Sequence, residues 1–96
     1  MASEVGNIIL QQLGGNKFTV MTGAHNFVTG NKSLTFRIPN RSINMVEIKL
    51  NGRDQYDVTY YRYAKLVAKP VKIETDIDAE MLQERFTAVT GLDTHL

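Results

Sequence analysis

The chain contains no cysteine and only two histidines and two prolines among its 96 residues. Without cysteine, disulfides, zinc–thiolate sites and cysteine nucleophiles are all excluded. Two histidines are too few for a metal cluster without help from carboxylates, so we expect no metal and no cofactor. The absence of cysteine is compatible with a cytoplasmic protein.

Long hydrophobic runs are also missing. No segment approaches the roughly 18 apolar residues that a membrane-spanning helix needs, so we expect no membrane partner. The N-terminus has neither a positively charged region nor a long apolar stretch, so we expect no signal peptide. The composition, 43% hydrophobic and 22% charged, is typical of a globular protein, and the length suits one domain over residues 1–96.

The net charge is only +1, but it is unevenly distributed. Residues 17–72 carry ten Lys or Arg and three acids, a net charge of +7, whereas residues 73–96 carry six acids and one Arg, a net charge of −5. Such asymmetry can indicate a middle segment that binds a polyanion. It can equally indicate two parts of one domain that attract each other, and the sequence leaves both readings open.

The first third of the chain predicts a helix, a strand and a long loop. The helix spans residues 3–13, with Ser3 as its cap and Gly14 just after its end. Residues 17–21 favour a strand with Phe18 and Val20 on one face. Residues 23–32 predict a polar loop. One face of the helix is expected to hold Val5, Ile8, Ile9 and Leu13.

Four strands follow, at residues 33–38, 45–50, 56–63 and 66–74. The second and third are separated by a segment that contains Asn51 and Gly52, normally a two-residue hairpin signal. A two-residue loop would place apolar residues opposite polar ones, so we expect a five-residue loop over residues 51–55. Leu50 then pairs with Tyr56. The last strand contains Pro70, which lacks a donor N–H, so that strand is expected at a sheet edge or broken.

A second helix is predicted over residues 79–90. Asp78 is the expected N-cap, and Ile77 and Leu82 fit the positions of a hydrophobic staple. Its buried stripe is expected to hold Met81, Leu82, Phe86 and Val89. The fold prediction is therefore α+β: an antiparallel sheet of four or five strands with the N- and C-terminal helices packed on one face. The expected core contains Leu34, Phe36, Ile38, Val46, Ile48, Val58, Leu82 and Phe86.

Three segments read LGGNKFTVMTGAHNF, SLTFRIP and LQERFTAVTGL. They resemble a family of small uncharacterised proteins of bacteriophages, prophages and mobile elements. The resemblance covers the chain from Leu13 through Leu92. It implies a cytoplasmic protein of the host cell that is related to a phage or mobile element. It implies no particular activity and no catalytic residues.

The loop over residues 23–32 is of interest because Gly23, His25 and Asn26 combine unusual backbone with polar side chains. It is not a phosphate loop, since the spacing of its glycines is wrong and a strand pattern follows it. The acids from Asp76 to Glu80 do not complete a calcium loop either. No nucleophile has a base near it in the sequence, so we expect no enzyme.

The outward face of the sheet is the most informative feature. It is predicted to combine basic groups, which contact phosphates, with tyrosines, which stack on unpaired bases. The leading hypothesis is a non-enzymatic phage or mobile-element accessory protein with an unidentified protein partner. The alternative is a single-stranded nucleic-acid binder, and the oligomeric state stays open. The candidate nucleic-acid residues are Lys17, Arg37, Lys49, Tyr61, Tyr63 and Lys72.

Overall fold

A computed structural model describes residues 4–40 and 42–92, so the predicted cap Ser3 lies outside the described residues. Five antiparallel strands form one sheet in the order β1-β2-β3-β4-β5, in which each strand pairs with its neighbours in the sequence. The strands are β1 (His25–Thr29), β2 (Ser33–Arg37), β3 (Met45–Leu50), β4 (Tyr56–Ala64) and β5 (Val67–Ile77). The helices are α1 (Glu4–Leu13), α2 (Asn16–Thr22), the 3-10 turn η1 (Ala79–Met81) and α3 (Leu82–Thr90).

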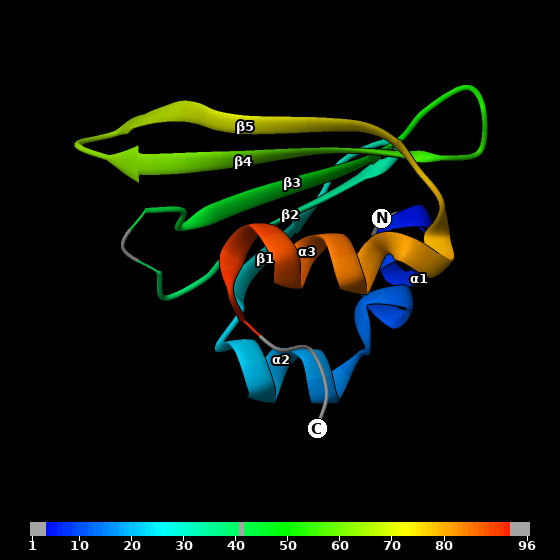
Figure 1. Cartoon of the computed structure of the whole chain (residues 1–96), viewed down its shortest axis with the longest axis horizontal. Helices are drawn as coiled ribbons and strands as arrows, with labels where there is room; N and C mark the ends of the chain where they lie inside the picture. Colours follow the sequence, from blue (N-terminus) through cyan, green and yellow to red (C-terminus); the bar gives the residue numbers. More distant parts are fainter. Residues whose placement is uncertain (1–3, 41, 93–96) are drawn as a thin grey trace.

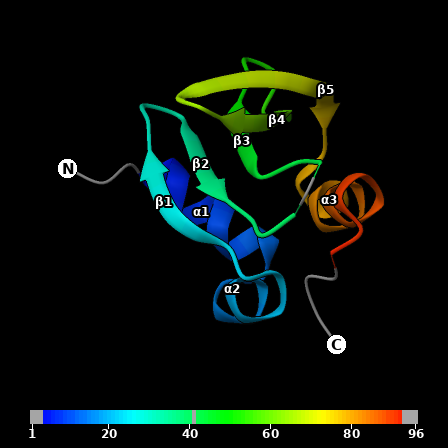
Figure 2. The ribbon, with the colours of Figure 1, turned by 90° about the vertical axis from the view of Figure 1, so that its left-hand side faces the viewer.

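The helices lie together on one side of the sheet, and none of the helices in the described residues covers the other side (Figures 1 and 2). This arrangement confirms the predicted α+β fold, with N- and C-terminal helices beside an antiparallel sheet. The strand that contains Pro70 is β5, and it lies at an edge of the sheet as predicted. Within the described ranges, no helix is both long enough and apolar enough to cross a membrane.

The register between β3 and β4 is the predicted one. Leu50 pairs with Tyr56, and the loop between them is closed by the Asn51 N–H, which donates to the Gln55 carbonyl oxygen over 2.8 Å. The same register pairs Ile48 with Val58. Since cross-strand partners point to the same side, this register keeps the apolar residues of both strands under the helices.

The strand predicted over residues 17–21 is wrong, because this segment is the helix α2. Its β-rich composition is overridden by packing, since Phe18 and Thr22 are four residues apart and share the buried side of the helix. Val20 therefore points away from the core and is 80% exposed. The segment predicted as a loop over residues 23–32 contains β1. Gly23 ends α2 at a φ of 73°, a left-handed conformation that glycine adopts without strain.

All eight residues of the expected core are buried, and an aromatic cluster forms its centre. The rings of Phe18 and Phe36 meet edge to face with centroids 5.3 Å apart, and Phe18 meets Phe86 at the same distance. Phe36 and Phe86 lie 6.1 Å apart. Since Phe18 belongs to α2, Phe36 to β2 and Phe86 to α3, the cluster joins α2 and α3 to the sheet.

Two predicted helix positions are wrong. Met81 is 40% exposed, because the chain after Asp78 begins as a 3-10 turn, whose tighter winding points Met81 away from the side that Leu82 buries. Ile8 is 47% exposed, since the large buried side chains of α1 are Ile9 and Leu13 and Ile8 lies beside their line. The staple positions Ile77 and Leu82 are both buried, as expected.

Tyr60 is the largest side chain that is fully buried, and it lies on the helix side of β4. Burial raises the pKa of its phenol far above the usual value of 10, and the nearby carboxylate of Glu74 raises it further, whereas Arg85 lowers it. The phenol must therefore stay protonated for the fold to keep this side chain inside.

Phe86→Ala is expected to lower the free energy of unfolding by about 3–5 kcal/mol, because it empties a site in contact with two other rings. Urea denaturation monitored by circular dichroism measures this loss. Met81→Ala, on the same helical segment but exposed, is the matched control and should stay within about 0.5 kcal/mol of the parent. A change of under 1 kcal/mol for Phe86→Ala would contradict the assignment of the cluster as the centre of the core.

Tyr60 is also expected to make the fold sensitive to alkali. Its folded pKa lies above the unfolded one, so its contribution is complete below pH 10 and is lost as the pH rises above 10. In that range the free energy of unfolding should fall by up to about 1.4 kcal/mol per pH unit for this one group. Urea denaturation of the parent and of Tyr60→Phe at pH 8 and pH 11 measures the effect. Equal losses in both proteins would contradict the assignment to Tyr60.

Candidate functional site

The uncovered side of the sheet carries four of the six candidate nucleic-acid residues. Burial alternates along β2, β3 and β4, so one set of side chains faces the helices and the other faces away. We call the second set the open face. It comprises Thr35, Arg37, Met45, Glu47, Lys49, Asp57, Thr59, Tyr61 and Tyr63. The structure therefore brings Arg37, Lys49, Tyr61 and Tyr63 onto one surface, as the sequence predicts.

Arg37 and Tyr63 form a stacked pair on this face. The guanidinium carbon of Arg37 lies 4.2 Å from the centre of the Tyr63 ring, within the range of a cation–π contact. Both side chains are half-buried, and the neighbouring Tyr61 is half-buried too. The Tyr61 hydroxyl donates to Glu47 Oε1 over 3.5 Å, a length at which a hydrogen bond is weak. Both tyrosine rings thus lie on the open face, and the Tyr63 ring is already stacked against the guanidinium of Arg37.

The loop that the sequence singles out lies next to this pair. His25 is the first residue of β1, and its Nδ1–H donates to the Gly23 carbonyl oxygen over 2.9 Å. Asn26 has a φ of 55° and lies where the pairing of β1 with β2 shifts register. This bulge opens a hollow of about 230 Å³ on the open face. The hollow is lined by Asn26, Val28, Thr35, Phe36, Arg37, Met45 and Tyr63.

The other two candidate residues do not belong to the open face. Lys17 lies on α2, in the helical layer, because the segment that contains it is not a strand. Lys72 pairs with Tyr60 across β4 and β5, so it faces the helices. Its ammonium group lies 3.8 Å from a carboxylate oxygen of Glu74, which also binds Arg85 of α3. The predicted orientation of Lys72 is wrong because a register shift near Tyr61 interrupts the simple alternation along β5.

The open face is not strongly basic. Its two cations, Arg37 and Lys49, are matched by the carboxylates of Glu47 and Asp57, and Lys49 is directly paired with Asp57 across β3 and β4. The four residues sum to no net charge. The positive charge counted over residues 17–72 must therefore gather elsewhere in the fold.

Much of it gathers on the turn end of the β4–β5 hairpin, which reaches beyond the helices (Figure 1). We call residues 62–72 the basic arm. This segment contains four cations and no acid, namely Arg62, Lys65, Lys69 and Lys72. Arg62 and Lys69 are cross-strand partners, a placement of like charges that destabilises a sheet. A charge count over residues 17–72 does not reveal this grouping, whereas the run without acids from 58 to 73 is its local signal in the sequence.

The helix side of the basic arm contains a cavity, and a large apolar side chain stands at the tip of the arm. A cavity of about 300 Å³ is lined by Arg62, Ala64, Lys65, Val67 and Lys69. The tip is a two-residue turn in which Lys65 and Leu66 both have positive φ, 53° and 66°. Such turns favour Asn-Gly, so this pair is held in an unfavourable conformation. Leu66 is 88% exposed, which makes it the most exposed of the large hydrophobic side chains among the described residues.

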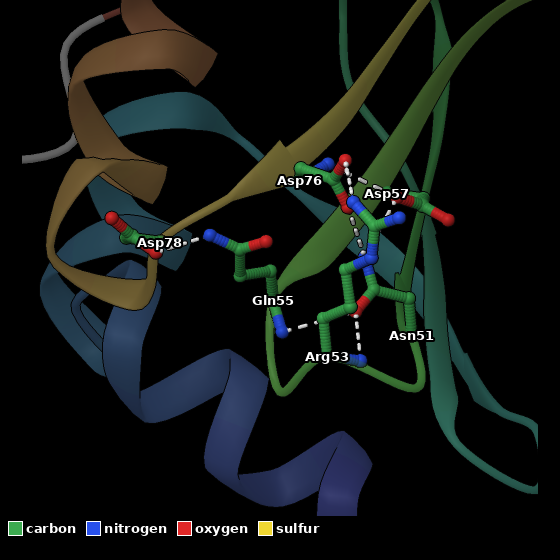
Figure 3. Close-up of polar contacts among 6 residues, drawn as sticks. All are labelled: Asn51, Arg53, Gln55, Asp57, Asp76 and Asp78. Atoms are coloured by element: carbon green, nitrogen blue, oxygen red, sulfur yellow. Dashed lines mark hydrogen bonds and ion pairs between the residues drawn. The ribbon is translucent and has the colours of Figure 1, made fainter.

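A polar cluster lies at the opposite end of the hairpin and fixes the five-residue loop (Figure 3). Asn51 Oδ1 accepts the backbone N–H groups of Arg53 and Gln55, and Asn51 Nδ2 donates to Asp57 and Asp76 over 3.1 and 2.9 Å. Arg53 also forms an ion pair with Asp76 over 3.1 Å. The carboxylates are thus occupied by donors of the loop. In the described part of the chain, no three His, Cys, Asp or Glu side chains are arranged to hold a metal ion.

Asn51→Ala is expected to lower the free energy of unfolding by about 1–3 kcal/mol, because several hydrogen bonds lose one partner at once. Arg53→Ala is the control: it removes one exposed ion pair and should cost less than about 1 kcal/mol. Urea denaturation of both variants tests the ranking. An Arg53→Ala loss that equals or exceeds that of Asn51→Ala would show that the ion pair, and not the amide, fixes the loop.

Comparison with protein-family models, with curated proteins and with solved structures finds no match for this chain. The resemblance to phage and mobile-element proteins therefore stays a prediction.

Proposed function

We propose that this chain is a non-enzymatic binding protein whose ligand is single-stranded nucleic acid, held at the arm end of the sheet. The accessory role in a phage or mobile element, which the sequence resemblance implies, is part of the same proposal. One observation supports single-stranded nucleic acid as the ligand. At the arm end of β4, successive residues put the rings of Tyr61 and Tyr63 on the open face and the guanidinium of Arg62 on the other side.

This alternation suits the two chemical components of a single strand. Bases stack on aromatic rings with little dependence on sequence, at about 1–3 kcal/mol per base. Phosphates bind the cations, of which Arg37 lies beside the rings and Arg62 and Lys69 on the reverse of the same hairpin. The carboxylate of Asp57 lies toward the other end of β4 and disfavours phosphates there, whereas the carboxylate of Glu47 accepts the Tyr61 hydroxyl. The strand is therefore expected at the arm end of the face.

Titration of a labelled single-stranded oligonucleotide, followed by fluorescence anisotropy at low and moderate salt, tests the proposal. Tyr61→Ala should weaken binding by about 1–3 kcal/mol, because one stacking surface is lost. Arg62→Ala should weaken binding of all sequences alike and make the affinity less steeply dependent on salt, because one phosphate contact is lost.

Lys17→Ala is the matched control, since it removes one exposed positive charge from α2 and leaves the arm and open face intact. It should bind like the parent protein. The absence of binding at both salt concentrations would retire the proposal. Equal weakening by Lys17→Ala and Arg62→Ala would also contradict it, because the attraction would then depend on net charge and not on the arm.

A further inference from the structure

Positive and negative charges lie at opposite ends of the molecule. The turn of the basic arm is at one end of the β4–β5 hairpin, and the junction of β5 with η1 and α3 is at the other (Figure 1). We call this junction the acidic corner. Its acids are Asp76, Asp78, Glu80 and Glu84. The arm and the corner of one molecule therefore cannot neutralise each other, although their charges are opposite.

Both ends keep charges that their own neighbours do not pair, although Lys72 of the arm and Asp76 of the corner take part in ion pairs. The ion pairs found within residues 4–40 and 42–92 join Arg53 to Asp76, and Glu74 to both Lys72 and Arg85. Arg62, Lys65 and Lys69 take part in none of them, so the like-charged pair of Arg62 and Lys69 keeps its repulsion. At the corner, Glu80 and Glu84 are exposed to solvent.

Each end also presents an apolar side chain amid its charges. Leu66 stands at the tip of the arm between Lys65 and Val67, held there by a turn with an unfavourable backbone. Met81 is exposed at the corner next to Glu80, because the 3-10 turn points it outward. The two ends are thus opposite in charge, and each exposes a large apolar side chain.

We propose that the basic arm of one molecule docks on the acidic corner of a second copy of this chain. The two surfaces are different, so the contact is head-to-tail, and each added molecule leaves one free arm and one free corner. A net charge of only +1 lets copies approach without general repulsion. Strand addition at the β5 edge is not the mode, because Pro70 and two register shifts interrupt that edge.

The proposed contact is small and electrostatic, and these two properties determine its affinity and its dependence on salt. A hairpin tip on a helix corner falls below the roughly 1,200 Å² of total buried area that stable complexes need, so the association is weak and depends on concentration. Exposed charges are screened within about 10 Å at 0.1 M salt, so the association weakens as salt is added. This inference does not rest on the proposed nucleic-acid function.

Sedimentation velocity of the nuclease-treated protein, over a range of concentrations at low and high salt, tests the contact. The average mass of the parent should rise with concentration at low salt and fall again at high salt. Two charge-reversed variants make the test specific: Lys65→Glu with Lys69→Glu on the arm, and Glu80→Lys with Glu84→Lys at the corner. Each should stay monomeric alone, with a dissociation constant raised by more than about tenfold.

The mixture of the two variants gives the decisive result. Its average mass should rise, because the unaltered arm of the corner variant meets the unaltered corner of the arm variant. Lys17→Glu with Lys49→Glu is the control, since it makes the same change in net charge away from the arm, and it should associate like the parent. If a double variant does not fold, Lys69→Glu compared with Lys17→Glu carries the same test.

Three outcomes would overturn the inference: a parent that stays monomeric at low salt, a control that dissociates as fully as the arm variant, or a mixture that stays monomeric.

Oligonucleotides and vesicles containing anionic lipid are then tested against parent and arm variant. Binding of either ligand that is lost in the arm variant, with a monomeric parent, would assign the arm to that ligand and not to a second copy. The nucleic-acid titration gives an independent answer, so one proposal can fail while the other stands.

Discussion

The contact among three phenylalanine rings determines how the two layers of this protein are arranged. The rings of the cluster meet in edge-to-face or tilted pairs and come from Phe18 on α2, Phe36 on β2 and Phe86 on α3. Such pairs stabilise a core by more than the burial of their apolar area alone. Because the rings of α2 and α3 meet the same side of β2, these two helices are confined to one face of the sheet. The open face with Arg37 and Tyr63 exists for that reason, and the β4–β5 hairpin can extend beyond the helices because its turn end takes no part in the cluster.

The parts of the fold that follow a simple periodicity could be predicted from the sequence. Alternation along β2, β3 and β4, together with the rule that apolar partners share a face, was enough to choose the register in which Leu50 pairs with Tyr56. The segment over residues 17–21 could not be predicted in this way, because its composition favours a strand. Only contacts with distant residues, through Phe18 and Thr22, make the helix the better solution.

The candidate site was predicted in part, and irregular backbone explains the rest. Arg37, Lys49, Tyr61 and Tyr63 lie on β2, β3 and β4, along which burial alternates, so alternation placed them correctly on the open face. Lys72 lies beyond a register shift in β5, which reverses the side that simple alternation assigns. The hollow beside Tyr63 depends on the bulge at Asn26, and no pattern in the sequence marks a bulge at a non-glycine residue.

The like-charged pair of Arg62 and Lys69 connects the two proposals physically. Two cations held opposite each other weaken the hairpin that carries them, and any anion bound between them removes that cost. A phosphate and a carboxylate of a second copy are equivalent in this respect, so the two proposed ligands are expected to compete for one site. A ligand of the arm shifts the association equilibrium by the difference between its affinity for the free arm and its affinity for the docked arm. If both proposals hold, nucleic acid bound at the arm opposes head-to-tail association, and association in turn lowers the affinity for nucleic acid by the same factor.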